Sequence, residues 1–94
     1  MTFSDICIVG TWTKHVALFR KEFPGITVIP TDDAKRRRLG DFKRYILWTN
    51  WVSHGLIEQI QAQIGKDPVK LRLCTGGTSK VKMLIRKIMA TEDG

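Results

Sequence analysis

The stretch that decides the fold is Ile6-Cys7-Ile8-Val9-Gly10, a continuous apolar run that ends at a glycine. An uninterrupted run of this length, rich in β-branched residues, is typical of a strand that is buried on both faces. Such a strand needs helices above and below it, so the run predicts an inner strand of a parallel sheet. A helix pattern follows at once: Thr13 is a candidate N-cap for a helix from Lys14, and Pro24-Gly25 ends that helix.

Strand-like and helix-like segments alternate along the rest of the chain. Strands are predicted at 6–9, 26–29, 45–49 and 69–74, and the last mixes apolar with cationic residues, which indicates a half-exposed strand at a sheet edge. Helices are predicted at 14–23, from the Ser53 cap to 64, and from the turn at 75–78 to 89. Between the second and third strands, Thr31-Asp32-Asp33 is expected to cap a short polar helix that carries the arginines at 36–38.

This alternation predicts one domain over residues 1–94. Parallel neighbours need crossover connections of about a dozen residues or more, which the helical segments supply. Right-handed crossovers favour a four-stranded parallel sheet in the order 2-1-3-4 with helices on both faces. The expected fold class is therefore α/β, a small three-layer, doubly wound, Rossmann-like fold.

The length, charge and residue composition of the chain restrict the kinds of function that it can have. The chain has 94 residues, which suffices for a single core and excludes a large multi-substrate enzyme. Sixteen Lys+Arg against nine Asp+Glu give a net charge of +7, which favours polyanionic partners such as nucleic acid, nucleotides or acidic protein surfaces. No apolar run reaches the ~18 residues of a membrane span and no signal segment is evident, so we expect a cytoplasmic protein without membrane association. The two cysteines and two histidines show no metal-ligand spacing, so neither a metal nor a cofactor is predicted.

The predicted strand order reverses between the strands at 6–9 and 45–49. Ligands of open parallel sheets bind at such a point, beyond the carboxyl ends of the strands. The loops that meet at this edge carry hydroxyls, a side-chain amide, indole rings and glycine-exposed amides. The candidate ligand-binding residues there are Gly10, Thr11, Trp12, Thr49, Asn50, Trp51, Ser53, His54, Thr75, Gly76, Gly77, Thr78, Ser79 and Lys80.

Two parts of this edge suit a phosphorylated ligand that carries a base. Backbone amides at Gly76-Gly77 can point at a phosphate at the start of the last helix, and Trp12 and Trp51 are expected to face each other, where an indole can stack a base. Each part has a structural alternative. Paired glycines also make tight turns without any ligand, and tryptophans complete small cores or form dimer patches.

Charged residues outside these loops are open to two interpretations as well. Arg36, Arg37 and Arg38 form either a nucleic-acid footprint or a solvated face. His54, beside Ser53 at a helix start, is a candidate general base or phosphate donor, and the alternative is an exposed first-turn histidine. His15 has the same two interpretations with less support.

An enzyme is a further hypothesis. Cys74 and Lys80 have the spacing of the Cys-x5-Arg phosphate loop, in which a thiolate attacks a phosphoryl group. Lysine lacks the bidentate grip of arginine, and no aspartate follows as a general acid. A phosphatase or phosphocarrier is therefore the third of our hypotheses.

The segment Trp48-Thr49-Asn50-Trp51-Val52-Ser53-His54 resembles the family called domain of unknown function 2325. Members have a first strand ending in Gly, a mid-chain threonine–x–x–valine–serine–histidine segment and a final strand, Gly/Ser-rich turn and helix, and the resemblance runs from about residue 6 to residue 88. Thr49, Ser53 and His54 fit the mid-chain motif and Gly10 fits the first turn. The resemblance implies a small Rossmann-like protein of a bacterium, mobile element or phage, with no established activity. Trp12, Trp51 and the dense arginines depart from the family pattern.

The sequence therefore supports three candidate functions. The first is a non-enzymatic module that binds a phosphate-bearing ligand, either a nucleotide or nucleic acid, at the carboxyl edge of the sheet. The second is a protein-interaction module, such as a homodimer through exposed aromatic residues or a partner of an acidic protein. The third is a small phosphotransfer enzyme that uses Cys74 or His54. Because a chain this short buries little surface, we expect a homodimer.

Overall fold

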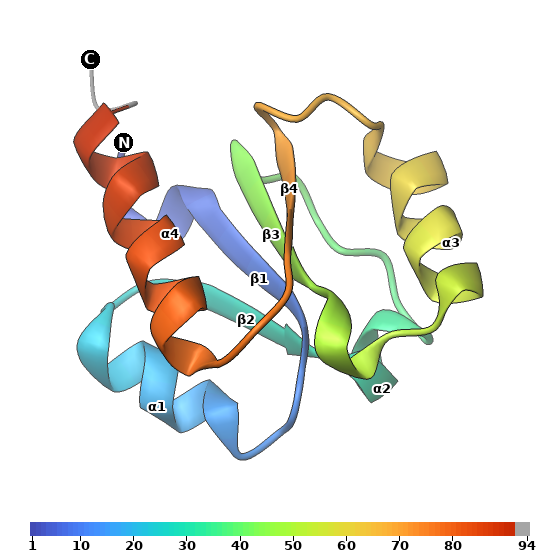
Figure 1. Cartoon of the computed structure of the whole chain (residues 1–94), viewed down its shortest axis with the longest axis horizontal. Coiled ribbons are helices and arrows are strands. Elements are labelled where there is room, and N and C mark those ends of the chain that lie inside the picture. The colour runs from blue at the N-terminus through green and yellow to red at the C-terminus, as the bar shows by residue number, and fades with distance from the viewer. Residues whose placement is uncertain (92–94) are drawn as a thin grey trace.

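A computed structural model of the chain describes residues 1–91 and contains one parallel sheet of four strands in the order β2-β1-β3-β4 (Figure 1). The strands are β1 (Ile6–Thr11), β2 (Thr27–Pro30), β3 (Arg44–Trp48) and β4 (Leu71–Cys74). The helices are α1 (His15–Glu22), α2 (Thr31–Ala34), α3 (His54–Ile64) and α4 (Thr78–Thr91), with single 3-10 turns η1 (Phe3–Asp5) and η2 (Thr49–Trp51). The predicted fold class and strand order are confirmed.

Helices cover both faces of the sheet (Figure 1), and the buried side chains form two core layers, one on each face. Ile6 and Ile8 of β1 pack with residues of α1 and α4, whereas Cys7 and Val9 pack with residues of α3. All six residues of β1 are buried, as expected for an inner strand covered on both faces. None of the helices within residues 1–91 has the length and apolar character of a membrane span.

The predicted N-caps of α1 and α3 have different outcomes. Ser53 is confirmed as the N-cap of α3, because its Oγ accepts the Leu56 N–H at 3.2 Å. The Thr13 cap is wrong: the N-cap position of α1 is Lys14, and it makes no side-chain capping bond. The chain instead enters α1 through a backbone turn, in which the N–H of His15 donates to the carbonyl of Trp12 at 2.9 Å.

The predicted polar helix after the second strand is much shorter than expected. α2 ends at Ala34, its N-cap position is Pro30, and the three arginines at 36–38 follow it outside any helix. Tertiary packing explains the early end. Leu39 is fully buried against the α3 layer, and its N–H donates to Oε1 of Gln63 at 2.8 Å, which draws the chain away from the helical path.

Two predictions near β4 and α4 need correction. β4 does lie at the sheet edge, but it starts at Leu71 and not at residue 69, and Leu73, which the alternation of apolar and cationic residues over 69–74 assigns to the covered face, is 50% exposed. Leu71 packs into the α3 layer, whereas Leu73, two residues further on the same face, lies beyond the cover of that helix. Lys82, which lies off the apolar face predicted for the last helix and would therefore face water, is largely covered and pairs with Glu22 of α1 at 3.0 Å.

Gly10 lets the end of β1 pass close to the end of β3. Its φ is +91°, and a Cβ there would lie 2.8 Å from the carbonyl oxygen of Trp48 and 2.8 Å from Cγ1 of Val52. The β1–β2 register also shifts between Val9 and Thr11, as in a glycine bulge. Only glycine fits this position.

We expect Gly10→Ala to lower the free energy of unfolding by about 1–3 kcal/mol, because it adds both backbone strain and a steric clash. Urea denaturation followed by circular dichroism measures the change. The matched control is Gly55→Ala in α3, where the nearest atom to the new Cβ is 4.0 Å away and helix propensity favours alanine by about 0.5–1 kcal/mol. Equal effects of the two substitutions would contradict this role of Gly10.

Candidate functional site

The carboxyl ends of the strands carry two neighbouring clefts. The larger, of about 480 Å³, lies beyond β1 and β2 and is lined by Thr11, Trp12, Thr13, Lys14, Pro30, Thr31, Asp32, Lys35 and Trp51. The smaller, of about 360 Å³, is lined by Trp12, Lys14, His15, Trp48, Asn50, Trp51, Gly76, Gly77 and Thr78. Both clefts share Trp12, Lys14 and Trp51, so the indole pair forms a wall common to the two.

Three tryptophans and a histidine form a cluster that runs from the core to solvent. Trp48 is fully buried, and its ring lies 4.6 Å from that of Trp51 at an interplanar angle of 80°. Trp51 is partly buried and lies 5.7 Å from Trp12, which is 47% exposed. His15 stacks on Trp48 at 5.2 Å and contacts Trp51 at 5.6 Å. The predicted pairing of Trp12 with Trp51 is confirmed.

The loop after β4 is tied to the end of β3. The carbonyl of Gly76 accepts the indole N–H of Trp48 at 2.8 Å and an amide N–H of Asn50 at 2.6 Å, and the N–H of Gly76 donates to Oδ1 of Asn50 at 3.1 Å. The hydroxyls of Thr49 and Thr75 lie 2.6 Å apart. One of the amides predicted to receive a phosphate is thus already engaged within the protein, and the loop is a wall of the smaller cleft.

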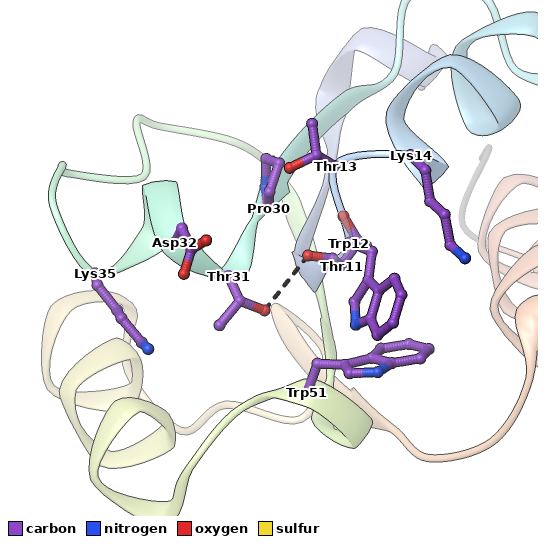
Figure 2. A pocket seen from close by; sticks show the side chains of 9 residues that line it. All are labelled: Thr11, Trp12, Thr13, Lys14, Pro30, Thr31, Asp32, Lys35 and Trp51. Atoms are coloured by element: carbon purple, nitrogen blue, oxygen red, sulfur yellow. Dashed lines mark hydrogen bonds between the residues drawn. The ribbon is translucent and has the colours of Figure 1, made fainter.

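The larger cleft combines polar and charged groups from β1 and α2. Thr31 donates its hydroxyl hydrogen to the carbonyl of Thr11 at 3.4 Å, which links the start of α2 to the end of β1 (Figure 2). Thr11 is 1% exposed, and its own Oγ1 has no hydrogen-bond partner among residues 1–91. Asp32 and Lys35 lie with Thr31 on one side of the indole pair, and Lys14 lies on the other (Figure 2).

His15, and not His54, belongs to the tryptophan cluster beside the smaller cleft. Its Nδ1 is buried and has no hydrogen-bond partner among the described residues. Desolvation lowers the pKa of His15 below its ordinary value of 6.5, and the positive charge of Lys14 lowers this pKa further. His54 is exposed and lines neither cleft. The signal for His15 in the sequence is its spacing of four residues from Phe19, which puts both side chains on the core face of α1.

The other predicted ligand residues are dispersed. Ser53 serves as a helix cap, and Ser79 and the three arginines at 36–38 are exposed and line neither cleft. Lys80 lines a separate apolar cleft of about 420 Å³ with Cys74, Met83, Leu84 and Lys87. The structure therefore brings together Thr11, Trp12, Asn50, Trp51, Gly76, Gly77 and Thr78, while Gly10 sits behind them against Trp48.

Cys74 has the wrong environment for a nucleophile. Desolvation raises the pKa of its thiol, and the opposing charge of Lys80 has the smaller effect. Burial likewise raises the pKa of Cys7 to about 12. Because catalytic cysteines need a depressed pKa, these environments disfavour thiolate chemistry at neutral pH.

Comparison with protein-family models, with curated proteins and with solved structures finds no significant match to this chain. The resemblance to the domain of unknown function 2325 therefore stays a prediction.

The position of His15 predicts a pH effect on stability. Because the folded protein protonates this histidine less readily than the unfolded chain does, the free energy of unfolding should fall as the pH drops through about 6.5. The loss should stop below the lowered pKa of the folded state. Urea unfolding between about pH 5 and 8 measures this dependence.

His15→Phe, which keeps a ring against Trp48, should remove that pH dependence. The control is His54→Phe, which removes an exposed histidine outside the aromatic cluster and should retain the dependence. An unchanged pH profile in His15→Phe would contradict the assignment.

Proposed function

We propose that this protein is a non-enzymatic module that binds a base-bearing phosphate ligand, a nucleotide or nucleic acid, at the carboxyl edge of its sheet. The observation that carries the proposal is the half-exposed Trp12, which packs on Trp51 in the common wall of two clefts. Lys14 and Lys35 line the same edge and supply positive charge.

Stacking on these indoles is the expected mode of base binding, and it contributes about 1–3 kcal/mol per base in single-strand binders. The rings of Trp12 and Trp51 are 5.7 Å apart and inclined at 60°, so they contact each other and leave no slot for a base between them. Nζ of Lys14 lies 4.5 Å from the Trp12 ring centroid and covers one face of it. A base therefore stacks on a remaining indole face, with the ammonium of Lys14 beside it.

Phosphate contacts in this proposal come from side chains. The first strand–helix turn, Gly10-Thr11-Trp12-Thr13-Lys14, has an indole where dinucleotide-binding turns have a second glycine for close backbone approach. The Gly76 N–H already donates a hydrogen bond to Oδ1 of Asn50. Lys14 and Lys35 line the larger cleft and supply positive charge there, so binding should weaken steeply as salt rises.

A second candidate function is homodimerisation at the β4 edge. Leu73 of β4 and Met83 of α4 are 50% and 66% exposed, and an apolar cleft lies between these two elements. Exposed apolar groups beside an edge strand are typical of contacts between chains.

The binding proposal is tested by calorimetric titration with the four ribonucleoside 5′-monophosphates and a short single-stranded oligonucleotide, at low and high salt. Trp12→Ala should weaken binding by about 5-fold to 150-fold, as loss of one stacked base implies. Its control is Leu18→Ala, which truncates another exposed apolar side chain outside both clefts. Lys35→Gln should weaken binding more than Lys21→Gln, although the two variants have the same net charge.

Saturable, salt-sensitive binding that these two pairs of variants alter as stated supports the proposal. Absence of binding by every phosphate ligand, or equal effects within each pair, would overturn it.

The dimer proposal predicts that the wild-type protein sediments as a dimer at micromolar concentration, even in high salt. Leu73→Lys should shift it to monomer, because a charge would be buried in the interface. Leu18→Lys, at a 42% exposed position on α1, is the control and should leave the dimer intact. A monomeric wild-type protein would refute this second function.

A further inference from the structure

The larger cleft contains one carboxylate among its cations. Asp32 lines it together with Lys14 and Lys35, and the Asp32 carboxylate makes no ion pair or side-chain hydrogen bond with another described residue. Asp32 is exposed and its ionised carboxylate is only an acceptor, so its negative charge repels a phosphate and its oxygens can accept hydrogen bonds from donor groups of a ligand. Hydroxyl groups are such donors.

Asp32 differs from its neighbour Asp33 in lining the cleft. Acidic residues in a first helical turn are stabilising, and α2 has two of them, Asp32 and Asp33. Only Asp32 lines the cleft. Asp33 supplies the same charge to the same turn and is therefore the natural comparison residue.

A second observation points to a ligand in the same cleft. Thr11 is almost completely buried, and its hydroxyl has no partner within residues 1–91, although it lines this cleft. A buried hydroxyl without a partner costs stability, and such groups mark places where a water or ligand atom completes the hydrogen bonding. The neighbouring Thr31 is held by its bond to the carbonyl of Thr11.

The size and layout of the cleft restrict the ligand. Its volume of about 480 Å³ is within the range of small-ligand sites, roughly 300–1,000 Å³. The indole pair stands at one side, and Asp32 and Lys35 stand at the other (Figure 2).

From these observations we infer that the cleft binds a ribonucleoside monophosphate, with Asp32 accepting hydrogen bonds from the vicinal 2′ and 3′ hydroxyls. The inference rests on the proposed function and names its ligand class. The base stacks on the indole wall and a lysine contacts the phosphate. Within a nucleic-acid chain the 3′ oxygen is esterified, so a carboxylate that accepts from both hydroxyls selects a free nucleotide over an internal residue of RNA.

The test compares the four ribonucleoside 5′-monophosphates with their 2′-deoxy counterparts by calorimetric titration. Wild-type protein should bind at least one ribonucleotide about tenfold or more tightly than its deoxy form, as loss of a hydrogen bond to a charged group implies. Asp32→Asn should reduce that preference to about twofold or less while keeping or improving deoxynucleotide binding, since a like charge near the phosphate is removed. Asp33→Asn should keep the full preference.

The remaining outcomes of the titrations separate failure of this inference from failure of the proposed function. Equal binding of the ribo and deoxy forms, or a preference that Asp32→Asn leaves unchanged, overturns the inference and leaves the proposed function standing. Binding of the oligonucleotide alone also overturns the inference while supporting the nucleic-acid form of the proposed function. Failure of every phosphate ligand to bind overturns both. Circular dichroism of Asp32→Asn confirms that a lost preference does not reflect lost folding.

Discussion

The hydrogen bond from the buried indole of Trp48 to the carbonyl of Gly76 is the interaction on which the candidate site depends. It joins the end of β3 to the loop that enters α4, two segments far apart in the sequence. Trp48 also provides the surface on which His15 stacks and against which Trp51 packs edge-on. A buried indole N–H needs a partner, so the loop after β4 is fixed at a place set by β3. The smaller cleft is the space left between these fixed groups.

The other constraint at this edge is the close approach of β1 to β3. Gly10 lies where any Cβ would meet the Trp48 carbonyl, so the backbone of β1 can reach the same residue that holds the β4 loop. The register shift after Val9 then carries Thr11 toward Pro30 and the start of α2. Bringing the ends of β1 and β2 together places Trp12, Thr31 and Asp32 around one cleft. The close approach that glycine permits at position 10 therefore helps to set where the larger cleft lies.

Much of the fold was predictable because the apolar runs at 6–9 and 45–48 are continuous and the Ser53 cap is local. The length of α2 was not, since the burial of Leu39 depends on packing against α3, and its hydrogen bond goes to Gln63, which lies 24 residues further along the chain. In the site, topology alone predicted that Trp12 meets Trp51. It did not predict that Asn50 occupies the Gly76 amide, or that His15 rather than His54 joins the cluster, because these depend on side-chain packing. Asp32 and Lys35 were not predicted as site residues, because they follow β2, which lies outside the point where the strand order reverses, although its carboxyl end lies at the same edge.

The way this edge is built bears on the kind of selectivity that the proposed function has. Backbone amides at a glycine-rich turn are fixed donors and hold a phosphate strongly. Here the turn after β1 carries the indole of Trp12, and the Gly76 amide in the turn after β4 donates to Asn50. Lysine ammonium groups on flexible side chains attract a phosphate without fixing its orientation. Trp48 is buried and packs against Trp51 with the ring centroids 4.6 Å apart, and Thr31 ties the start of α2 to the end of β1, whereas Trp12 is half exposed. Orientation of a ligand at such a site depends on its base and sugar, and the phosphate contributes mainly long-range attraction.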